Sequence, residues 1–217
     1  MADITYIKHG EIDKIKWDAC ILDAVNSLIY AQSSYLDTLC QWDAIVLGDY
    51  EAVMPLPRRK KAGIGYLYQP AFTQQLGVFS KNSIAEETIS KFVAAAMNRY
   101  KFAEICLNYH NRCNNLNKAK VLQRVNYIFD LGFPYEHIYN NYSSSLKKKL
   151  SWIKKFENSY SPSKDFEETI QLYRQLYGDK IKGVSAEDFR RFVLLCRKLN
   201  EDQKIICRVA KDEAGNK

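Results

Sequence analysis

Residues 42–80, WDAIVLGDYEAVMPLPRRKKAGIGYLYQPAFTQQLGVFS, decide the fold expected for this chain. They contain three runs that favour β-strands, at residues 44–47, 52–56 and 64–68. The first two runs are joined by GDYE at 48–51, whose small and polar residues favour a tight reversal. A polar, basic loop at 58–63 joins the second run to the third. The stretch therefore predicts a β-meander.

Helical patterns flank this meander. Residues 11–24 predict a helix with one buried face, made of Ile12, Ile15, Ala19 and Leu22. Residues 4–8 precede it as a short strand, and residues 82–100 follow the meander as an amphipathic helix that leads into a strand at 103–108. We expect an α+β fold with a mixed, mostly antiparallel sheet flanked by helices.

The second half of the chain predicts further elements. We expect a strand at 125–131, VNYIFDL, because Gly132 and Pro134 end the run. Helices are expected at 135–142, 143–156, 165–177 and 185–199, and a last strand at 205–211. SYSPSK at 159–164 has the composition of a turn or linker and predicts a domain boundary. The expected domains are residues 1–158 and an incomplete second domain at 165–217.

Composition limits the class of protein. The hydrophobic fraction is 47% and the charged fraction 26%, which is typical of a globular protein. No apolar run approaches the roughly 20 residues that cross a bilayer, and the N-terminus is not a secretory signal, so a cytoplasmic location is expected. The six cysteines lack CxxC spacing, which predicts buried thiols and no metal site. Cys113, in a polar stretch, is expected to be the most exposed thiol.

Positive charge is concentrated in the second half of the chain. Residues 1–110 carry 11 basic and 12 acidic side chains, whereas residues 111–217 carry 21 and 13. This excess is compatible with an anionic partner such as a phosphorylated substrate, CoA or RNA, and surface charge for solubility explains it almost as well.

This order of elements resembles a known family. Residues 1–156 resemble the first domain of the Fem-type (FemX-like) branch of the GNAT acyl-CoA N-acyltransferase superfamily, in which two GNAT-like domains follow each other. The resemblance rests on WDAIVLGDYEAVMPLPRRKK, on YLYQPAFTQQLGVFS and on VNYIFDLGFPYEHIYNNYSSSLKKKLSWIKK. DFEETIQLYRQLYGDK and RVAKDEAGN resemble the opening of the second GNAT-like domain. The chain is thus expected to hold one GNAT-like domain and the start of another.

The resemblance implies transfer of an acyl or aminoacyl group to an amine. The donor would be acyl-CoA or aminoacyl-tRNA, and the acceptor a small molecule or the amine of a cell-wall precursor. The amine would attack the ester or thioester carbonyl directly, aided by proximity and by backbone donors to the oxyanion. The donor site would lie in the second domain, so we expect this chain to be the acceptor-side part of a longer protein and to bind no cofactor itself.

One junction departs from the family pattern. GNAT domains hold the CoA pyrophosphate in a loop of form Q/R-x-x-G-x-G/A at a helix N-terminus, where glycine lets the backbone approach the phosphates. The matching residues here are Gln74, Gln75 and Gly77, with bulky Leu76 and Val78 between and after them. They are the candidate cofactor-binding residues, although an ordinary structural turn is the favoured interpretation.

Candidate substrate-binding residues come from basic and aromatic positions. Their full set is Arg58, Arg59, Tyr68, Tyr142, Lys147, Lys148 and Trp152. The lysines lie beside Trp152 on the expected basic helix, where they could bind phosphate. The alternative is that they form a solvated helix face. A non-catalytic GNAT-scaffold binding module and a basic RNA-binding accessory protein, with tRNA as a possible partner, remain the rival functions.

Overall fold

The computed structural model describes residues 3–114, 116, 119–154, 160–181 and 183–210. The chain forms two compact units: unit 1 comprises Met1–Gln123 and Val184–Leu195, and unit 2 comprises Arg124–Gly183 and Cys196–Lys217. This division differs from the boundary that the sequence predicts at 159–164.

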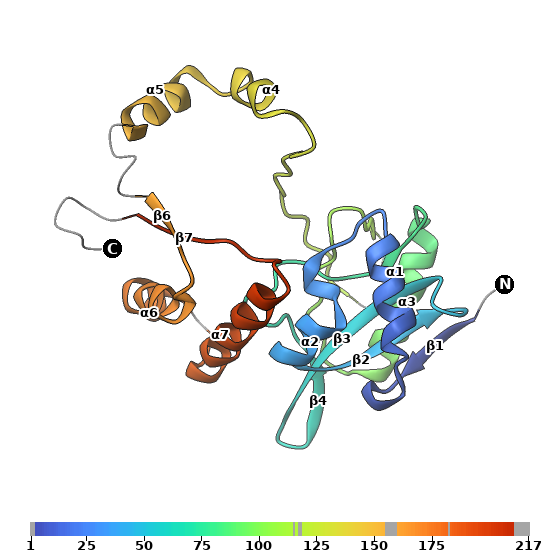
Figure 1. The fold of residues 1–217 in the computed structure, drawn as a ribbon. Coiled ribbons are helices and arrows are strands. Elements are labelled where there is room, and N and C mark those ends of the chain that lie inside the picture. Colours follow the sequence, from blue (N-terminus) through green and yellow to red (C-terminus); the bar gives the residue numbers. More distant parts are fainter. Residues whose placement is uncertain (1–2, 115, 117–118, 155–159, 182, 211–217) are drawn as a thin grey trace. The chain divides into compact units, whose positions relative to one another are not determined.

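Unit 1 is built on a five-stranded antiparallel sheet (Figure 1). Its strands are β1 Ile4–Ile7, β2 Gln41–Leu47, β3 Ala52–Lys61, β4 Ile64–Leu67 and β5 Phe79–Ser80. The order is β1-β2-β3-β4, and β5 pairs with the first residues of β3 while β4 pairs with the last. The predicted meander and the α+β class are therefore confirmed.

Helices cover both faces of this sheet (Figure 1). They are α1 Lys14–Asp23, α2 Ser33–Leu39 and α3 Glu86–Arg99, with short 3-10 turns at His9–Glu11 and Ile29–Ala31. Trp42 and Val46 of β2 belong to the core that includes residues of α1 and α2, whereas Ile45 belongs to the core that includes residues of α3. Successive side chains of a strand point to opposite faces, so β2 is buried on both.

The second strand of the meander is longer than the sequence predicts. β3 continues through Arg58 to Lys61, so the expected basic loop is mostly strand. The turn is confined to Ala62 and Gly63, whose φ angles of 49° and 78° match the two-residue reversal of a tight hairpin. Pro55 and Pro57 are tolerated because they lie between the parts of β3 that pair with β5 and β4.

The buried face of α1 is not the predicted one. Ile15 is 84% exposed and Leu22 is also exposed, whereas Trp17, Cys20 and Ile21 are buried. The indole N–H of Trp17 donates a 2.8 Å hydrogen bond to the carbonyl of Ala31. The large Trp17 side chain thus occupies the core, and the aliphatic side chains of Ile15 and Leu22 face solvent.

Unit 2 contains the remaining helices and a small sheet. The elements are α4 Tyr135–Asn140, α5 Ser144–Ile153, β6 Tyr160–Ser163, α6 Phe166–Tyr177, a 3-10 turn at Gly178–Lys180, and β7 Cys207–Ala210. β6 and β7 pair antiparallel, so the linker expected at 159–164 is a strand over its described residues. Helix α7, Ala186–Glu201, begins in unit 1 and ends in unit 2, where Arg197 contacts Glu167 of α6 at 2.5 Å.

Two predicted strands are wrong. Residues 103–108 make only isolated parallel bridges, Leu67 with Ala103 and Leu76 with Leu107. Residues 125–131 form no strand and are exposed to solvent. Residue composition favours a strand at both places, but a strand also needs a neighbour with a free edge.

The structure tests the burial that the sequence predicts for the cysteine thiols. Four cysteines are buried and two are half-buried, as expected, but Cys113 is only 6% exposed and packs in the core on the α3 side of the sheet, so the prediction for it is wrong. Among the described residues, no helix is long and apolar enough to cross a membrane. The same residues contain no group of three or more His, Cys, Asp or Glu side chains placed to hold a metal ion.

Candidate functional site

The loop with Gln74, Gln75 and Gly77 is packed against neighbouring side chains. Gly77 has a φ of 99°, and a Cβ placed on it would lie 2.3 Å from Oδ1 of Asn111. This glycine therefore makes room for a side chain of the protein itself. Gln74 is exposed, and Oε1 of Gln75 accepts a hydrogen bond from the backbone N–H of Tyr109 at 3.2 Å.

Two buried asparagines, Asn26 and Asn108, and the half-buried Asn111 hold the residue after Gly77. The Val78 carbonyl accepts hydrogen bonds from the amides of Asn26, Asn108 and Asn111, at 2.8, 3.2 and 3.0 Å, and the Val78 N–H donates to Asn111 at 2.7 Å. No local pattern predicts this cluster, because Asn26 and Val78 are far in the chain from Asn108 and Asn111. Buried polar groups are normally satisfied in this way, so the cluster serves to fix the backbone.

The same loop lacks the helix N-terminus of a phosphate cradle. It runs into β5, and α3 begins only at Glu86, with Glu87 also in its first turn. Two carboxylates there already complement the positive end of the helix dipole and would repel a pyrophosphate. The geometry around Gln74, Gln75 and Gly77 is that of a structural turn, and their cofactor role stays a prediction.

Arg58 forms an ion pair with the buried carboxylate of Asp43. Its Nε lies 2.5 Å from Oδ2 of Asp43, without the alignment of a hydrogen bond, so the contact is an ion pair. Asp43 also accepts hydrogen bonds from the Tyr6 hydroxyl at 2.7 Å and the His9 backbone N–H at 2.9 Å. Burial favours a raised pKa for Asp43, but these hydrogen bonds and Arg58 outweigh it and lower the pKa. Arg58 thus stabilises the fold.

Arg59 and Tyr68, two of the predicted substrate-binding residues, are brought together. The guanidinium carbon of Arg59 lies 4.1 Å from the centre of the Tyr68 ring, and Nη2 contacts Asp188 of α7 at 2.8 Å. Burial favours a raised pKa for Asp188, yet hydrogen bonds from Ser185 and the charge of Arg59 lower it. Asp188 lies 129 residues from Arg59 in the chain, so no local pattern reveals the pair.

One hollow of about 310 Å³ lies in unit 1, beside the hairpin that joins β2 to β3. Two ion pairs lie in its wall: Lys16 contacts Asp49 at 2.6 Å, and Lys81 contacts Asp23 at 3.4 Å. Burial raises the pKa of the Cys20 thiol in its wall to about 11. At neutral pH this thiol is protonated and a poor nucleophile.

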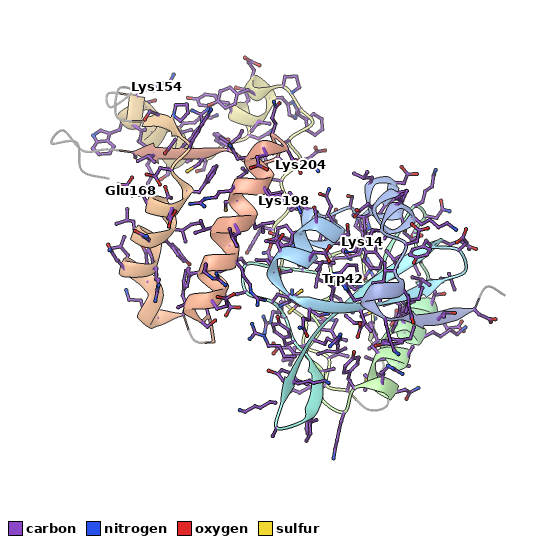
Figure 2. The ribbon with its side chains drawn as sticks, turned by 60° about the horizontal axis from the view of Figure 1, so that its bottom comes forward. Lys14, Trp42, Lys154, Glu168, Lys198 and Lys204 are labelled. Carbon is purple, nitrogen blue, oxygen red and sulfur yellow. The ribbon has the colours of Figure 1, made fainter. Side chains whose placement is uncertain are left out.

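Unit 2 carries a set of basic and aromatic side chains that are exposed or half-buried on α4 and α5. We call it the α4–α5 surface: Tyr135, Tyr139, Tyr142, Lys147, Lys148, Lys149, Trp152 and Lys154. Its backbone is well defined locally because the Ser143 hydroxyl caps α5 by accepting from the Leu146 N–H at 3.2 Å. Lys154 at the end of α5 is exposed (Figure 2).

The aromatic and basic parts of this surface are in contact. The ring centre of Tyr139 lies 5.9 Å from that of Tyr135 and 5.9 Å from that of Tyr142. The Lys147 amine lies 5.5 Å from the Tyr139 ring and donates to the Asn140 carbonyl at 3.0 Å. Tyr142 and Lys147 are thus brought together by Tyr139, which lies one helical turn after Tyr135 and was a weaker candidate in the sequence.

The α5 helix exposes its ends and sides to solvent. Its sequence SSLKKKLSWI contains three lysines and no acidic residue, and none of its residues is buried. Trp152 is 61% exposed, and Ile153 and Leu146 are exposed as well. A helix with this composition offers positive charge and an aromatic ring to a partner.

Comparison with protein-family models, with curated proteins and with solved structures gave no match for this chain. The proposed function therefore rests on the contacts of the described residues.

Proposed function

We propose that this chain takes part in transfer of an aminoacyl group to an amine, and that the α4–α5 surface binds the tRNA of the donor. The observation that carries this proposal is the contact of Lys147 with the Tyr139 ring beside the exposed Lys148 and Trp152. The Fem-type resemblance supplies the class of reaction, and the surface supplies the choice of donor.

The α4–α5 surface has the two components that bind single-stranded or looped RNA. Lysines neutralise phosphates and release counterions, which gives affinity that falls steeply with salt. Exposed rings such as Trp152 and Tyr135 stack on bases, each worth about 1–3 kcal/mol. Together they fit an RNA better than a single small anion.

The geometry at Gly77 supports tRNA over acyl-CoA as the donor. A CoA pyrophosphate needs free backbone N–H groups at a helix N-terminus. Here the Val78 N–H already donates to Asn111, and α3 starts with two carboxylates. The proposal therefore assigns no acyl-CoA site to unit 1.

The protonation state of the cysteine thiols favours direct attack by the acceptor amine on the donor. Burial raises the pKa of Cys40 to about 12 and that of Cys196 to about 11, so both are protonated at neutral pH. A thioester intermediate on either cysteine would need the thiolate form. We therefore propose a transfer without a covalent enzyme intermediate, in which this chain binds and orients the donor.

The binding step is tested by fluorescence anisotropy with labelled tRNA over a series of salt concentrations. We expect the logarithm of the binding constant to fall linearly with the logarithm of salt concentration. The variant Lys148→Glu/Lys149→Glu should bind at least about tenfold more weakly, because two phosphate contacts become repulsive. Lys60→Glu/Lys61→Glu is the matched control, because these exposed lysines of β3 lie in unit 1 and give the same change in net charge.

Equal losses in both variants would mean that total charge, and not the α4–α5 surface, drives binding, and the proposal would fail. Binding of acetyl-CoA with no binding of tRNA, measured by calorimetry, would also contradict it.

A second function, RNA binding without transfer, is favoured by the same surface because binding alone requires nothing more than lysines and rings. The two functions are separated by incubating the chain with labelled aminoacyl-tRNA and small amine acceptors. Appearance of an aminoacylated amine supports transfer, whereas specific tRNA binding with no transfer supports an RNA-binding module.

A further inference from the structure

Residues 124–131, RVNYIFDL, form an exposed segment with the alternation of a β-strand. The odd positions are large and apolar, and their exposed fractions are 81% for Val125, 93% for Tyr127, 57% for Phe129 and 79% for Leu131. The even positions are polar at Arg124, Asn126 and Asp130, with one exception, Ile128, which is apolar and 59% exposed. A period of two with one apolar face is typical of a strand that pairs with another and buries that face.

Within the described part of the chain, no strand or isolated bridge pairs with this segment. Its backbone N–H and C=O groups are thus not paired with any described strand, and five large apolar side chains of the segment are exposed beside them. An exposed run of this kind is a template for another strand. The segment also has defined ends, because Oδ1 of Asp130 accepts from the Gly132 N–H at 2.8 Å and Pro134 caps α4.

We propose that the segment 124–131 pairs antiparallel with the same segment of a second copy of this chain, centred on Tyr127. A two-fold axis through Tyr127 brings residues together in fixed pairs: Arg124 with Asp130, Val125 with Phe129, Asn126 with Ile128, and Tyr127 with its own copy. Opposite residues of an antiparallel pair point to the same face, so this register forms one continuous apolar face from both copies.

Charge selects this register over its neighbours. A shift by one residue places Arg124 opposite Phe129 or opposite Leu131, so this charge loses its opposite-charge partner. A shift by two in either direction places Arg124 opposite Ile128 or opposite Gly132, and no Arg–Asp pair remains. Parallel pairing in register would set Arg124 beside Arg124 and Asp130 beside Asp130, which is repulsive. Antiparallel pairing about Tyr127 gives two opposite-charge pairs, as an isologous interface requires.

The second oxygen of Asp130 is the one that would meet Arg124. Its Oδ1 makes the local bond to Gly132, which holds the carboxylate at the end of the segment. The Arg124 side chain is exposed. The pairing therefore uses groups that the segment already presents.

A charge swap tests the register, with mass measured by sedimentation equilibrium over a range of protein concentrations. The wild-type chain should move from the monomer mass of 25.2 kDa to twice that value. Arg124→Asp and Asp130→Arg should each weaken the dimer about tenfold or more, because both symmetric pairs become like-charged. The double variant Arg124→Asp/Asp130→Arg should restore the dimer, since it exchanges the two charges. A monomer at all concentrations, or a double variant as weak as the singles, would overturn the proposal.

A disulfide at the two-fold axis provides a second test. Opposite Cα atoms of an antiparallel pair lie about 4.5–5.5 Å apart, within the range of a disulfide. Tyr127→Cys should therefore form a covalent dimer under mild oxidation. Asn126→Cys is the matched control, because position 126 faces Ile128 and not itself; it should cross-link only when mixed with Ile128→Cys.

Cross-linking of Asn126→Cys alone to the same extent as Tyr127→Cys would contradict the register. A monomeric wild-type chain whose amides at 124–131 resist hydrogen exchange would show that the segment pairs within its own chain, and this would also overturn the proposal.

Discussion

Strand β2 and the segment 124–131 have similar sequences and opposite environments. Both are rich in apolar and β-branched residues and both carry one aspartate, as WDAIVL and VNYIFDL show. β2 lies between β1 and β3 and is buried on both faces, whereas the segment pairs with no described strand and its apolar side chains face solvent. Strand propensity measures how well side chains fit a pleated surface, so it needs a neighbour to take effect.

The two aspartates make the same point about charge. Asp43 of β2 is buried and meets Tyr6, Arg58, Tyr100 and the backbone of His9. Asp130 is exposed, and its Oδ1 accepts a local hydrogen bond from the Gly132 N–H at 2.8 Å. A carboxylate in an apolar run is therefore either the centre of a buried network or the end of a turn, and the surrounding fold decides which.

The largest expected effect comes from removing a core ring of β2. Trp42, labelled in Figure 2, is fully buried. Its ring centre lies 4.8 Å from that of Trp17. Trp42→Ala should lower the free energy of unfolding of unit 1 by about 3–5 kcal/mol, because it leaves a large cavity. Denaturant unfolding followed by Trp17 fluorescence, in a Trp152→Phe background, measures this.

Phe129→Ala is the matched variant in the exposed segment. Measured in dilute protein, where chains are monomeric, it should change the free energy of unfolding of unit 1 by less than about 0.5 kcal/mol. A loss as large as that of Trp42→Ala would mean that the segment is part of the unit 1 core.

A smaller effect is expected from neutralising the buried carboxylate. Asp43→Asn should destabilise unit 1 by about 2–3 kcal/mol, because it leaves Arg58 without its counter-charge. Asp130→Asn should have little effect, because this carboxylate is exposed. Denaturant titration at pH 7 compares the two.

The pH dependence of the Asp43 contribution has a defined sign. The pKa of Asp43 is lower in the folded chain than in the unfolded chain, so the unfolded state binds more protons as the pH falls. The stabilisation is complete above the unfolded value of about 4 and is lost as the pH falls through the folded pKa. Asp43→Asn should flatten this acid limb, and an unchanged acid limb would show that other carboxylates control it.

A further comparison adds one methyl group to a glycine. Gly77→Ala should cost about 1–3 kcal/mol, because its φ is positive and the new Cβ would meet Asn111. Gly132→Ala should cost less: its nearest neighbour, Oδ1 of Asp130, lies at 3.1 Å on an exposed side chain. Thermal unfolding compares the pair, and equal shifts would contradict the packing assigned to Gly77.

Local patterns predicted the elements whose signals lie close together in the chain. The meander follows from short turns between apolar runs, and α3, α6 and α7 follow from helical spacing. The basic character of α5 likewise follows from its three lysines. The face of α1 was predicted wrongly because two apolar stripes share that helix, and only the fit of Trp17 beneath Ala31 chooses between them.

The candidate site was predicted in part. Arg59 and Tyr68 were singled out separately, and the fold brings them together with Asp188, whose pairing with Arg59 no local pattern shows. Tyr142, Lys147, Lys148 and Trp152 lie on the α4–α5 surface, and Tyr139 completes it. Gly77 looked like a remnant of a phosphate loop, but the packing of Asn111 against it is a contact across 34 residues.

The sequence by itself determined the α+β class, the order of most helices and strands, and the uneven distribution of charge. Each of these depends on residues within a few positions of one another, where spacing and propensity act directly. The tertiary structure decided which apolar face is buried, which aspartate is paired, and which strand-like run has a neighbour. Those outcomes depend on which of several distant side chains fill a limited number of buried sites. Local sequence does not determine which of them are buried.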